Sequence, residues 1–305
     1  MFGPPIRVER PAASTMAATL LPSISGFARG CGRVTISNTD AAAIDALIAD
    51  GVDAIVLGAA ITAGDDLERA STARVLEINV MAQIPILQSA IRHDVRRVVN
   101  LSSAAAYGAA GQRHQVLHEE TPCDPVSFYA ISKFTSERSV ARHAELFGGD
   151  FLSVRLSAVF GPWERANAVR DTPSLQFQIL GAFARGEPAL LPEPGMKDWI
   201  YAPDAAEGVA VLVEAERPRH RLYNISSGAD WSALQWGEAF AARHSGLQCR
   251  LAASGEKTAI KLHGGNRAPL SVARMADEFG WRARFGCAES AAAMSDWWMQ
   301  HKEAI

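Results

Sequence analysis

The sequence predicts an α/β protein with a doubly wound parallel sheet and a second, smaller domain. From Arg33 onward, short apolar runs with the length of strands alternate with longer stretches of helical periodicity. The runs lie at 33–37, 53–57 and 97–101, and a helical stretch separates each from the next. Such a β-α-β-α-β alternation is typical of parallel sheets whose strands are joined by helical crossovers.

Two helices are predicted between these three strands, from an N-cap residue and from the spacing of apolar residues. Asp40 is a suitable N-cap for a helix over Ala41–Ala49, which carries an apolar stripe. The next helix is predicted over Thr72–His93, with its apolar residues mostly on one side. Pro85 lies inside this helix and lacks a backbone N–H, so we expect a kink there.

The composition shifts after Phe160, which divides the chain into a first domain of residues 1–160 and a second of residues 161–305. A helix over 126–147 and a strand over 151–156 complete the first domain. The second is expected to contain strands over 195–201 and 222–225 and helices over 173–185, 204–214, 232–245, 271–278 and 286–301.

Composition excludes several classes of function. The 305 residues are 48% hydrophobic, which allows a sizeable core, and the net charge of −3 without a basic run argues against nucleic acid as a partner. Cys31, Cys123, Cys249 and Cys287 lack the spacing of a metal site or a disulfide framework, so we expect no metal and a reduced, cytoplasmic setting. No apolar stretch reaches about 18 residues, so no membrane span is expected.

The strongest chemical signal lies between residues 97 and 133. Ser103 follows the buried strand, and Tyr129 and Lys133 stand four apart on the next helix, which brings them to one face. Ligands of parallel α/β sheets bind outside the carboxyl ends of the strands, where Ser103 is expected. A nearby ammonium lowers the pKa of a phenol from about 10. These three residues therefore predict a proton-transfer site suited to alcohol oxidation with a nicotinamide.

Residues 1–32 allow three interpretations. They are basic, contain serine and threonine and hold a single acid, Glu9, as in a targeting segment. Alternatively, residues 6–10 form a short strand and the rest a loop. The third interpretation is a start codon placed wrongly in the gene.

From residue 33 to residue 305 the sequence resembles the extended short-chain dehydrogenase/reductase family, the NAD-dependent epimerases and dehydratases. The segments that carry the resemblance are Asp53-Ala-Ile-Val-Leu-Gly-Ala-Ala60, Asn79-Val80, Leu101-Ser-Ser-Ala-Ala-Ala-Tyr-Gly108, Tyr129-x-x-x-Lys133, Arg155-Leu-Ser-Ala-Val-Phe-Gly-Pro162 and Lys197-Asp-Trp-Ile-Tyr-x-x-Asp204. The resemblance implies a Rossmann-like NAD(P)-binding domain, incomplete at its N-terminus, and a smaller substrate-binding domain.

The resemblance also implies roles for individual residues. Tyr129 would be the acid/base, Lys133 would lower its pKa and hold the nicotinamide ribose, and Ser103 would complete the catalytic set. The implied cofactor-binding residues, besides Tyr129 and Lys133, are Ala59 and Ala60 beside the cofactor, Asn79 behind them, and Ser157 and Val159 near the nicotinamide amide. The helices at 72–93 and 126–147 would form the four-helix interface of a homodimer.

The front of the chain departs from the family. The family begins with a strand, a G-x-x-G-x-x-G turn and a helix that receives the pyrophosphate. Gly26, Gly30 and Gly32 do not fit this motif, because 33–37 is already a later strand. We therefore expect either poor dinucleotide binding or a shortened reading of a longer enzyme. The cofactor is expected to be NAD or NADP: Glu9 would favour NAD, and Arg10 would favour NADP.

Further departures bear on the small-molecule substrate. Family dehydratases carry an Asp-Glu pair where this chain has Ala104 and Ala105, which argues against sugar dehydration. Ala158 and Lys197 stand where sugar-nucleotide enzymes usually have Asn and Arg, and Lys cannot grip a phosphate with two parallel hydrogen bonds as Arg does. Two arginines, Arg165 and Arg170, are either anion ligands or solvated loop residues.

The expected function is that of an NAD(P)-dependent oxidoreductase or epimerase acting on a carbohydrate or related polar hydroxy compound. One alternative is a non-catalytic or N-terminally truncated member of the same fold, with a sensing or scaffold role and weak dinucleotide binding. Another is an isomerase that keeps its cofactor tightly bound.

Overall fold

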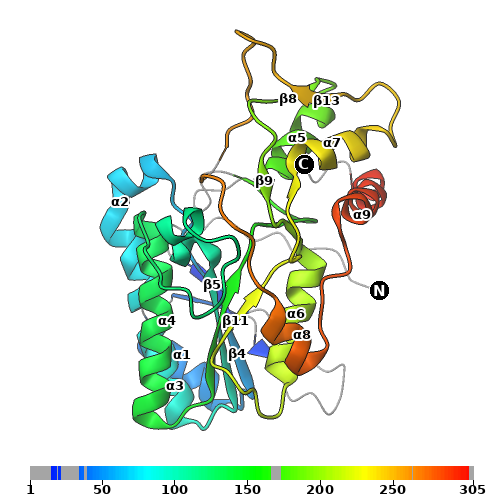
Figure 1. The fold of residues 1–305 in the computed structure, drawn as a ribbon. Helices are drawn as coiled ribbons and strands as arrows, with labels where there is room; N and C mark the ends of the chain where they lie inside the picture. The colour runs from blue at the N-terminus through cyan, green and yellow to red at the C-terminus, as the bar shows by residue number, and fades with distance from the viewer. Residues whose placement is uncertain are drawn as a thin grey trace.

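A five-stranded sheet with the order β11-β6-β5-β4-β2 forms the centre of the molecule (Figure 1). Four strands run parallel, and β2 pairs antiparallel with β4 at one edge. The strands are β2 (Leu20–Leu21), β4 (Ala54–Leu57), β5 (Arg97–Ser103), β6 (Phe151–Leu156) and β11 (Leu222–Ile225). The predicted doubly wound α/β architecture is confirmed.

The computed structural model describes residues 15–18, 20–21, 34–37, 40–165, 173–262 and 264–301 of the chain. Several sequence predictions fall outside these residues: the strand at 6–10 with Glu9 and Arg10, the glycines Gly26, Gly30 and Gly32, and Arg170. No helix within the described ranges has the length and apolar character needed to cross a membrane.

The predicted strand at 33–37 forms as β3 (Val34–Ser37), but it pairs elsewhere than expected. It lies antiparallel to β1 (Thr15–Ala18) in a separate two-stranded sheet. The edge of β4 that a parallel neighbour would occupy is taken by β2, which runs antiparallel. The prediction that 33–37 joins the parallel sheet is therefore wrong, because a local apolar pattern predicts a strand without specifying its partner.

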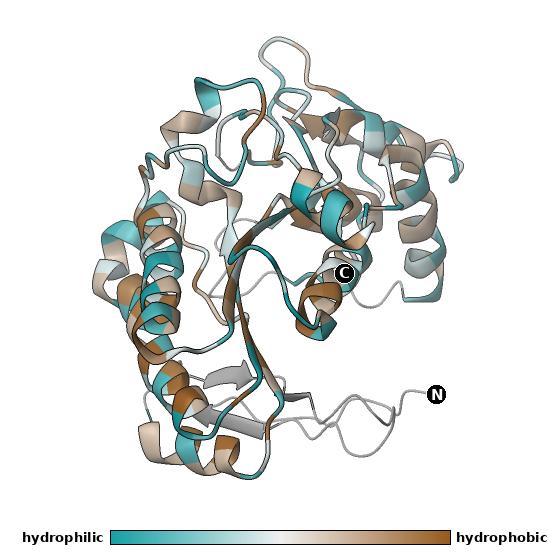
Figure 2. Ribbon diagram, turned by 60° about the horizontal axis from the view of Figure 1, so that its bottom comes forward, coloured by the Kyte–Doolittle hydropathy of each residue, from teal (hydrophilic) through white to brown (hydrophobic). Residues whose placement is uncertain are grey.

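Helices cover both faces of the central sheet (Figure 1). One face carries α1 (Ala41–Ala49), α3 (Gln83–Arg92) and α4 (Phe128–Phe147), and the other carries α6 (Ala202–Glu214) and α8 (Ala273–Phe279). Neighbouring residues of a strand point to opposite faces. Accordingly, Val98 belongs to the apolar cluster under the first group and Val99 to the cluster under the second, and both are fully buried. The central strands are mostly hydrophobic in Figure 2, whereas the helices show both colours.

The helix predicted over 72–93 is interrupted, and not at Pro85 itself. The chain forms α2 (Asp65–Leu76), a π-helical turn η1 (Glu77–Met81) and then α3. Pro85 has no N–H to donate to the carbonyl four residues earlier, which is that of Met81, so the break falls on the preceding turn. The wide turn buries three consecutive residues, and the middle one is Asn79.

The C-terminal half adds a further apolar cluster, which includes Trp199, Trp231 and Trp236. Its elements are β7 (Val159–Phe160), α5 (Leu175–Ala184), β8 (Ala189–Leu191), β9 (Met196–Lys197), β10 (Ile200–Tyr201), β12 (Trp231–Ser232), α7 (Ala233–Ala241), β13 (Cys249–Leu251) and α9 (Cys287–Gln300). The five helices predicted for this half are all present. The same half also returns to the central sheet through β11, α6 and α8.

The strand predicted over 195–201 is instead two short strands, β9 and β10, separated at Asp198. Asp198 is fully buried, and its carboxylate accepts hydrogen bonds from Ser157, Ser226 and the backbone N–H of Leu270. The backbone leaves the extended strand where this carboxylate turns inward to meet its donors. A single-strand prediction is wrong here because the apolar pattern contains no sign of these distant partners.

Candidate active site

A cavity of about 1200 Å³ lies at the carboxyl ends of the parallel strands. Gly58 after β4, Ser103 at the end of β5 and Ser157 after β6 contribute to its wall. The opposite wall comes from the C-terminal half and includes Lys197 and Arg267. Its place matches the position at which parallel α/β sheets bind their ligands.

Ser103, Tyr129 and Lys133 all line this cavity. Ser103 caps the short 3-10 helix η2 (Ala104–Tyr107), since its Oγ accepts a 3.1 Å hydrogen bond from the N–H of Ala105. The Nζ atom of Lys133 lies 5.9 Å from the ring centroid of Tyr129. The structure thus brings the three predicted residues to one cavity.

Two capping interactions begin α4 next to Tyr129. The Oγ of Ser127 accepts a hydrogen bond of 3.1 Å from the N–H of Ala130, as an N-cap serine does. The N–H of Tyr129 donates to the Oε1 of Glu68, on α2, over 2.9 Å. Two of the helix's unpaired N–H groups are therefore satisfied in its first turn, which carries Tyr129.

Lys133 occupies a largely buried position in the cavity wall. The residue is only 4% exposed, and its Nζ donates a 2.8 Å hydrogen bond to the carbonyl of Leu101. Burial lowers the pKa of Lys133 from 10.5 to about 8, and the nearby Glu137 carboxylate partly counteracts this. The ammonium is therefore mostly charged at neutral pH while already partly desolvated.

Asn79 supports the wall on the β4 side from behind. Its Oδ1 accepts a 2.7 Å hydrogen bond from the N–H of Ile61, and its Nδ2 donates to the carbonyl of Ile61 and to the Oγ of Ser132. This fully buried amide ties the segment after β4 to α4. Of the two predicted alanines in that segment, Ala60 lines the cavity and Ala59 does not.

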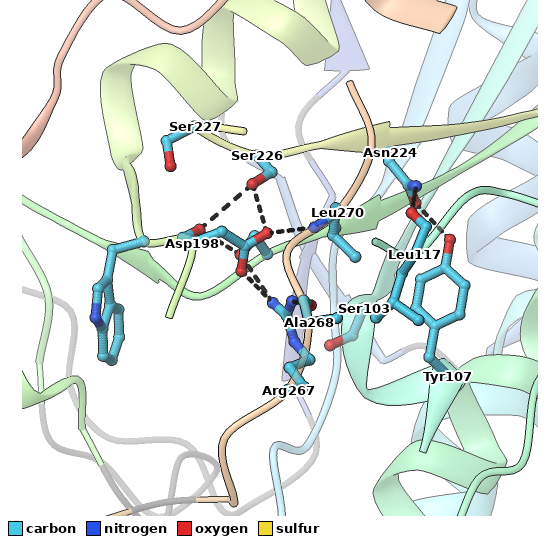
Figure 3. Close-up of polar contacts among 12 residues, drawn as sticks. Ser103, Tyr107, Leu117, Asp198, Asn224, Ser226, Ser227, Arg267, Ala268 and Leu270 are labelled. Carbon is cyan, nitrogen blue, oxygen red and sulfur yellow. Dashed lines mark hydrogen bonds and ion pairs between the residues drawn. The ribbon is translucent and has the colours of Figure 1, made fainter. Parts of the chain in front are cut away.

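Ser157 and Val159 line the cavity on the β6 side. The hydroxyl of Ser157 lies 2.6 Å from the carbonyl oxygen and 2.7 Å from Oδ1 of Asp198, and accepts from Nη2 of Arg267. Arg267 also pairs with Oδ1 of Asp198 over 2.8 Å (Figure 3). Sequence reasoning missed Arg267 because it lies 110 residues from Ser157, with no local spacing to connect them.

The side of the cavity facing the C-terminal half bears on the substrate. Lys197 lines it, with Nζ 5.5 Å from the ring centroid of Trp199, and burial lowers the pKa of Lys197 to about 8. Ala104 and Ala105 line the wall next to Ser103 and offer no group for proton transfer. Arg165 is exposed and does not line the cavity.

A family model and the related proteins of known name point to the same protein family. The model of the NAD dependent epimerase/dehydratase family matches residues 13–226. The dTDP-glucose 4,6-dehydratase of Streptomyces antibioticus is 26% identical over 267 residues, which cover 86% of this chain and 75% of that protein. The UDP-glucose 4-epimerase of Corynebacterium glutamicum is 25% identical over 168 residues, and there the match spans 52% of this chain and half of the relative.

Solved structures share the fold at low sequence identity. RMD from Pseudomonas aeruginosa, complexed with NADPH, has a TM-score of 0.71 at 19% identity, with 87% of each chain covered. UDP-glucose 4-epimerase from Thermotoga maritima, with UDP-glucose, has a TM-score of 0.73 at 15% identity, with 88% of this chain and 84% of that chain covered. DesIV from Streptomyces venezuelae, with NAD and TYD bound, has a TM-score of 0.68 at 22% identity, covering 87% and 79%.

The family match includes the strand ends and the helix that form the cavity, from β4 to β11. It confirms the resemblance to the extended short-chain dehydrogenases that the sequence motifs indicated. Because the match extends over more than half of its residues, this protein belongs to the NAD dependent epimerase/dehydratase family.

Proposed function

We propose that this protein is an NAD(P)-dependent epimerase or oxidoreductase that acts on a hydroxyl group of a carbohydrate or related compound. The observation that supports it most is the convergence of Ser103, Tyr129 and Lys133 on one cavity at the carboxyl ends of the strands. When bound there, a nicotinamide dinucleotide supplies the hydride acceptor. The protein's own part is to hold the substrate oxygen and to move its proton.

Tyr129 exchanges the proton of the substrate hydroxyl. A phenol is a weak base at neutral pH, so it needs a neighbouring positive charge. Lys133 supplies this charge from one turn along α4, where its ammonium keeps two protons beyond the one donated to Leu101. They would be available to the Tyr129 oxygen and, once a cofactor is bound, to a hydroxyl of its ribose.

Ser103 orients the substrate oxygen. Its Oγ is fixed by the hydrogen bond that it accepts from Ala105. Among the residues that the structure describes, no group accepts the proton of the Ser103 hydroxyl. That proton is therefore available to a substrate carbonyl or hydroxyl oxygen in the cavity.

The described residues fit the nicotinamide and ribose half of the cofactor. Gly58 and Ala60 leave room beside the sheet, and Asn79 holds the segment that contains Ala60 in place. Ser157 and Val159 line the opposite side. These positions support the cofactor-binding roles proposed for Ala60, Asn79, Ser157 and Val159, whereas Ala59 does not line the cavity.

The reaction class is inferred from the cavity wall and the relatives. The relatives named above act on UDP-glucose or dTDP-glucose, which favours a sugar or sugar derivative as the substrate. Removal of water from the sugar needs an additional acid and base, and Ala104 and Ala105 supply neither. Epimerisation or oxidation is therefore favoured over dehydration.

A melting experiment tests the proposal directly. The purified chain is heated with NAD⁺, NADH, NADP⁺ or NADPH, and a ligand at about 100 times its Kd adds roughly 2.7 kcal/mol of stability. A shift of a few degrees with one cofactor pair is expected for a domain of this size. No shift with any of the four, from a chain that melts cooperatively, would favour the non-catalytic alternative.

A matched variant then tests the chemistry. Tyr129→Phe removes only the phenolic oxygen, so it should keep the cofactor-dependent shift and lose turnover by about 10²-fold or more. Turnover is measured with UDP-glucose and dTDP-glucose, with and without added cofactor, which also separates an isomerase with tightly bound cofactor from a dehydrogenase. Undiminished turnover of Tyr129→Phe would refute the role of this tyrosine.

We also propose that the protein forms a homodimer. Its interface would consist of the helical segment 72–93 after β4 and of α4, which carries Tyr129 and Lys133. Met81, Phe128 and Ile131 are apolar and exposed on η1 and α4. A second copy would bury them. Sedimentation should give a dimer that Ile131→Arg converts to a monomer, and a monomeric parent chain would contradict the proposal.

A further inference from the structure

Glu137 lies one helical turn after Lys133 on α4 and is only 5% exposed. Its Oε1 accepts a 2.5 Å hydrogen bond from the Oγ of Ser102, the residue directly before Ser103. One carboxylate therefore connects the end of β5, which carries Ser103, with the helix that carries Tyr129 and Lys133. The function proposed above uses Ser103, Tyr129 and Lys133 but assigns nothing to Glu137.

Arg155 fixes the orientation of this carboxylate. It stands on β6 directly beside Ser102 and is 3% exposed. Its Nε lies 3.0 and 3.2 Å from the two oxygens of Glu137, and its Nη2 donates to Oε2 over 2.7 Å. Paired hydrogen bonds of this kind define both the distance and the plane of the two groups.

The other side of Arg155 is also held. Its guanidinium lies 4.3 Å from the ring centroid of Tyr107, and its Nη1 donates to the carbonyl of Glu119 over 3.3 Å. Tyr107 in turn has its hydroxyl 2.9 Å from Oδ1 of Asn224 on β11 (Figure 3). Glu137 is thus anchored to a buried polar layer that reaches across three parallel strands.

The charge of Glu137 acts on Lys133. Burial lowers the pKa of Lys133, and the Glu137 carboxylate is the group that raises it. The titratable and charged groups around this pair are Tyr129 on the same helix, Glu68, whose carboxylate accepts the N–H of Tyr129, Arg155 on β6, Tyr107 after β5, Glu119, whose charge acts on Tyr107, and Cys123, whose pKa is affected by the charges of Glu137 and Arg155. Among the three carboxylates, Glu137 is the one whose charge raises the pKa of Lys133.

We propose that Glu137 is a positioning residue of the Ser103, Tyr129 and Lys133 site, which fixes the strand end against the helix and keeps the buried ammonium of Lys133 charged. The part of this proposal that concerns catalysis rests on the proposed function, because it assumes that Ser103, Tyr129 and Lys133 carry out the reaction. Its physical content, the influence of Glu137 on Lys133, is independent of turnover and of any cofactor.

The chain allows this influence to be measured directly, because it has five lysines: Lys133, Lys197, Lys257, Lys261 and Lys302. Selective ¹³C labelling of lysine gives few NMR signals, and Lys133→Met identifies the one that belongs to Lys133. The signal is followed against pH in the full chain without cofactor. In Glu137→Gln the titration midpoint of Lys133 should fall by roughly one pH unit, because an opposite charge is lost and Arg155 is left unbalanced.

Asp150→Asn is the matched control. Asp150 pairs with the buried Arg97 over 2.7 Å, at the amino-terminal end of the same two strands. This variant also removes the charge of a carboxylate from a pair with a buried arginine, yet it should leave the Lys133 midpoint unchanged. Glu137→Asp keeps the charge and should hold the midpoint near that of the parent chain.

Removing one partner of a buried pair can prevent folding. If Glu137→Gln does not fold, Glu137→Gln with Arg155→Met removes both charges together, and the Lys133 midpoint should again fall. An unchanged midpoint in whichever variant folds, or an equal fall in Asp150→Asn, would overturn the proposal.

Kinetics separate this proposal from the proposed function. In Glu137→Gln the alkaline limit of maximal kcat should move to lower pH, because Lys133 loses its proton earlier and then supports Tyr129 less well. If Tyr129→Phe keeps full turnover, the catalytic assignment fails while the NMR result for Lys133 still stands. A normal kcat profile together with a shifted Lys133 midpoint would overturn the positioning role alone.

Discussion

The backbone N–H of Tyr129 donates a 2.9 Å hydrogen bond to the carboxylate of Glu68, a residue 61 positions earlier in the chain. The first N–H groups of a helix have no partner within the helix, and a negative charge is favoured at that end. Glu68 therefore secures the first turn of α4 at the residue that carries the proposed acid/base. It also lines the same cavity as Tyr129.

Glu68→Ala should lower the free energy of unfolding by about 1 kcal/mol, the usual cost of losing a helix cap. It should also lower kcat several-fold, because the first turn of α4 is less firmly held. Glu68→Gln keeps an acceptor oxygen, so its free energy of unfolding and its kcat should lie between those of the parent chain and those of Glu68→Ala. Urea unfolding and steady-state kinetics measure both effects.

Asp66→Ala is the control for that experiment. Asp66 is on the same helix, and its exposed carboxylate pairs with Arg69 rather than with α4. This variant removes the same charge from α2 and should be close to neutral, as surface pairs usually are. Equal behaviour of the two alanine variants would exclude a special role for Glu68.

The four tyrosines of the chain should titrate in two groups. Burial raises the pKa of Tyr107 and Tyr201 to about 12 and also raises that of Tyr223. Tyr129 lines the cavity beside the Lys133 ammonium, so its phenolate should form first as pH rises. Phenolate absorbance in the near ultraviolet should therefore show an early phase of one tyrosine, which Tyr129→Phe abolishes. Survival of that phase in the variant would assign it to another residue.

Lys133 should make stability depend on pH in a predictable direction. Its pKa is lowered from 10.5 to about 8 in the folded protein, so between these values the unfolded chain binds more protons. The free energy of unfolding then rises with pH across this window, by an upper limit of about 3 kcal/mol. Lys133→Met lacks this contribution, so the parent chain should gain stability relative to the variant from pH 8 to 10.5. Urea unfolding measures the free energy of unfolding of both chains at each pH. A difference between them that does not change with pH would contradict a lowered pKa of Lys133 in the folded protein.

The parts of the site that could be predicted from sequence are those held by one element or by two consecutive ones. Ser103 ends a strand whose apolar run is visible, and Tyr129 and Lys133 share a helix face at a spacing of four. Each of these relationships depends on local geometry, which a pattern of apolar and polar residues contains. Asn79 was accessible only through the family resemblance, because its partner Ile61 lies in a loop.

The parts that could not be predicted depend on packing between distant segments. The contact of Glu68 with Tyr129 spans 61 residues, and that of Arg267 with Ser157 spans 110. The same reason explains the wrong strand at 195–201, where Asp198 collects donors from three other segments. Apolar periodicity predicts which residues are buried, but it does not predict which polar groups contact one another in the folded protein.

Gly108 provides the last test, because its position relative to Asp124 allows no side chain. It follows Tyr107 in the turn after Ser103, with φ of 54°, and a Cβ atom there would lie 1.8 Å from the carbonyl oxygen of Asp124. That oxygen also accepts the N–H of Ala109, so the two segments cannot separate without losing a hydrogen bond. The turn that follows Ser103 is therefore fixed by a glycine.

Gly108→Ala should lower the free energy of unfolding by several kcal/mol, since both the backbone strain and the overlap with Asp124 must be relieved. Gly148→Ala is the control: Gly148 also has a positive φ, of 79°, but a Cβ there meets no atom within 4 Å. Its cost should be limited to the left-handed conformation, about 1–2 kcal/mol. Chemical unfolding of the two variants measures the difference, and equal losses would mean that the close approach to Asp124 does not constrain the turn. Because this turn is continuous with Ser103, Gly108→Ala should also reduce turnover more than Gly148→Ala does.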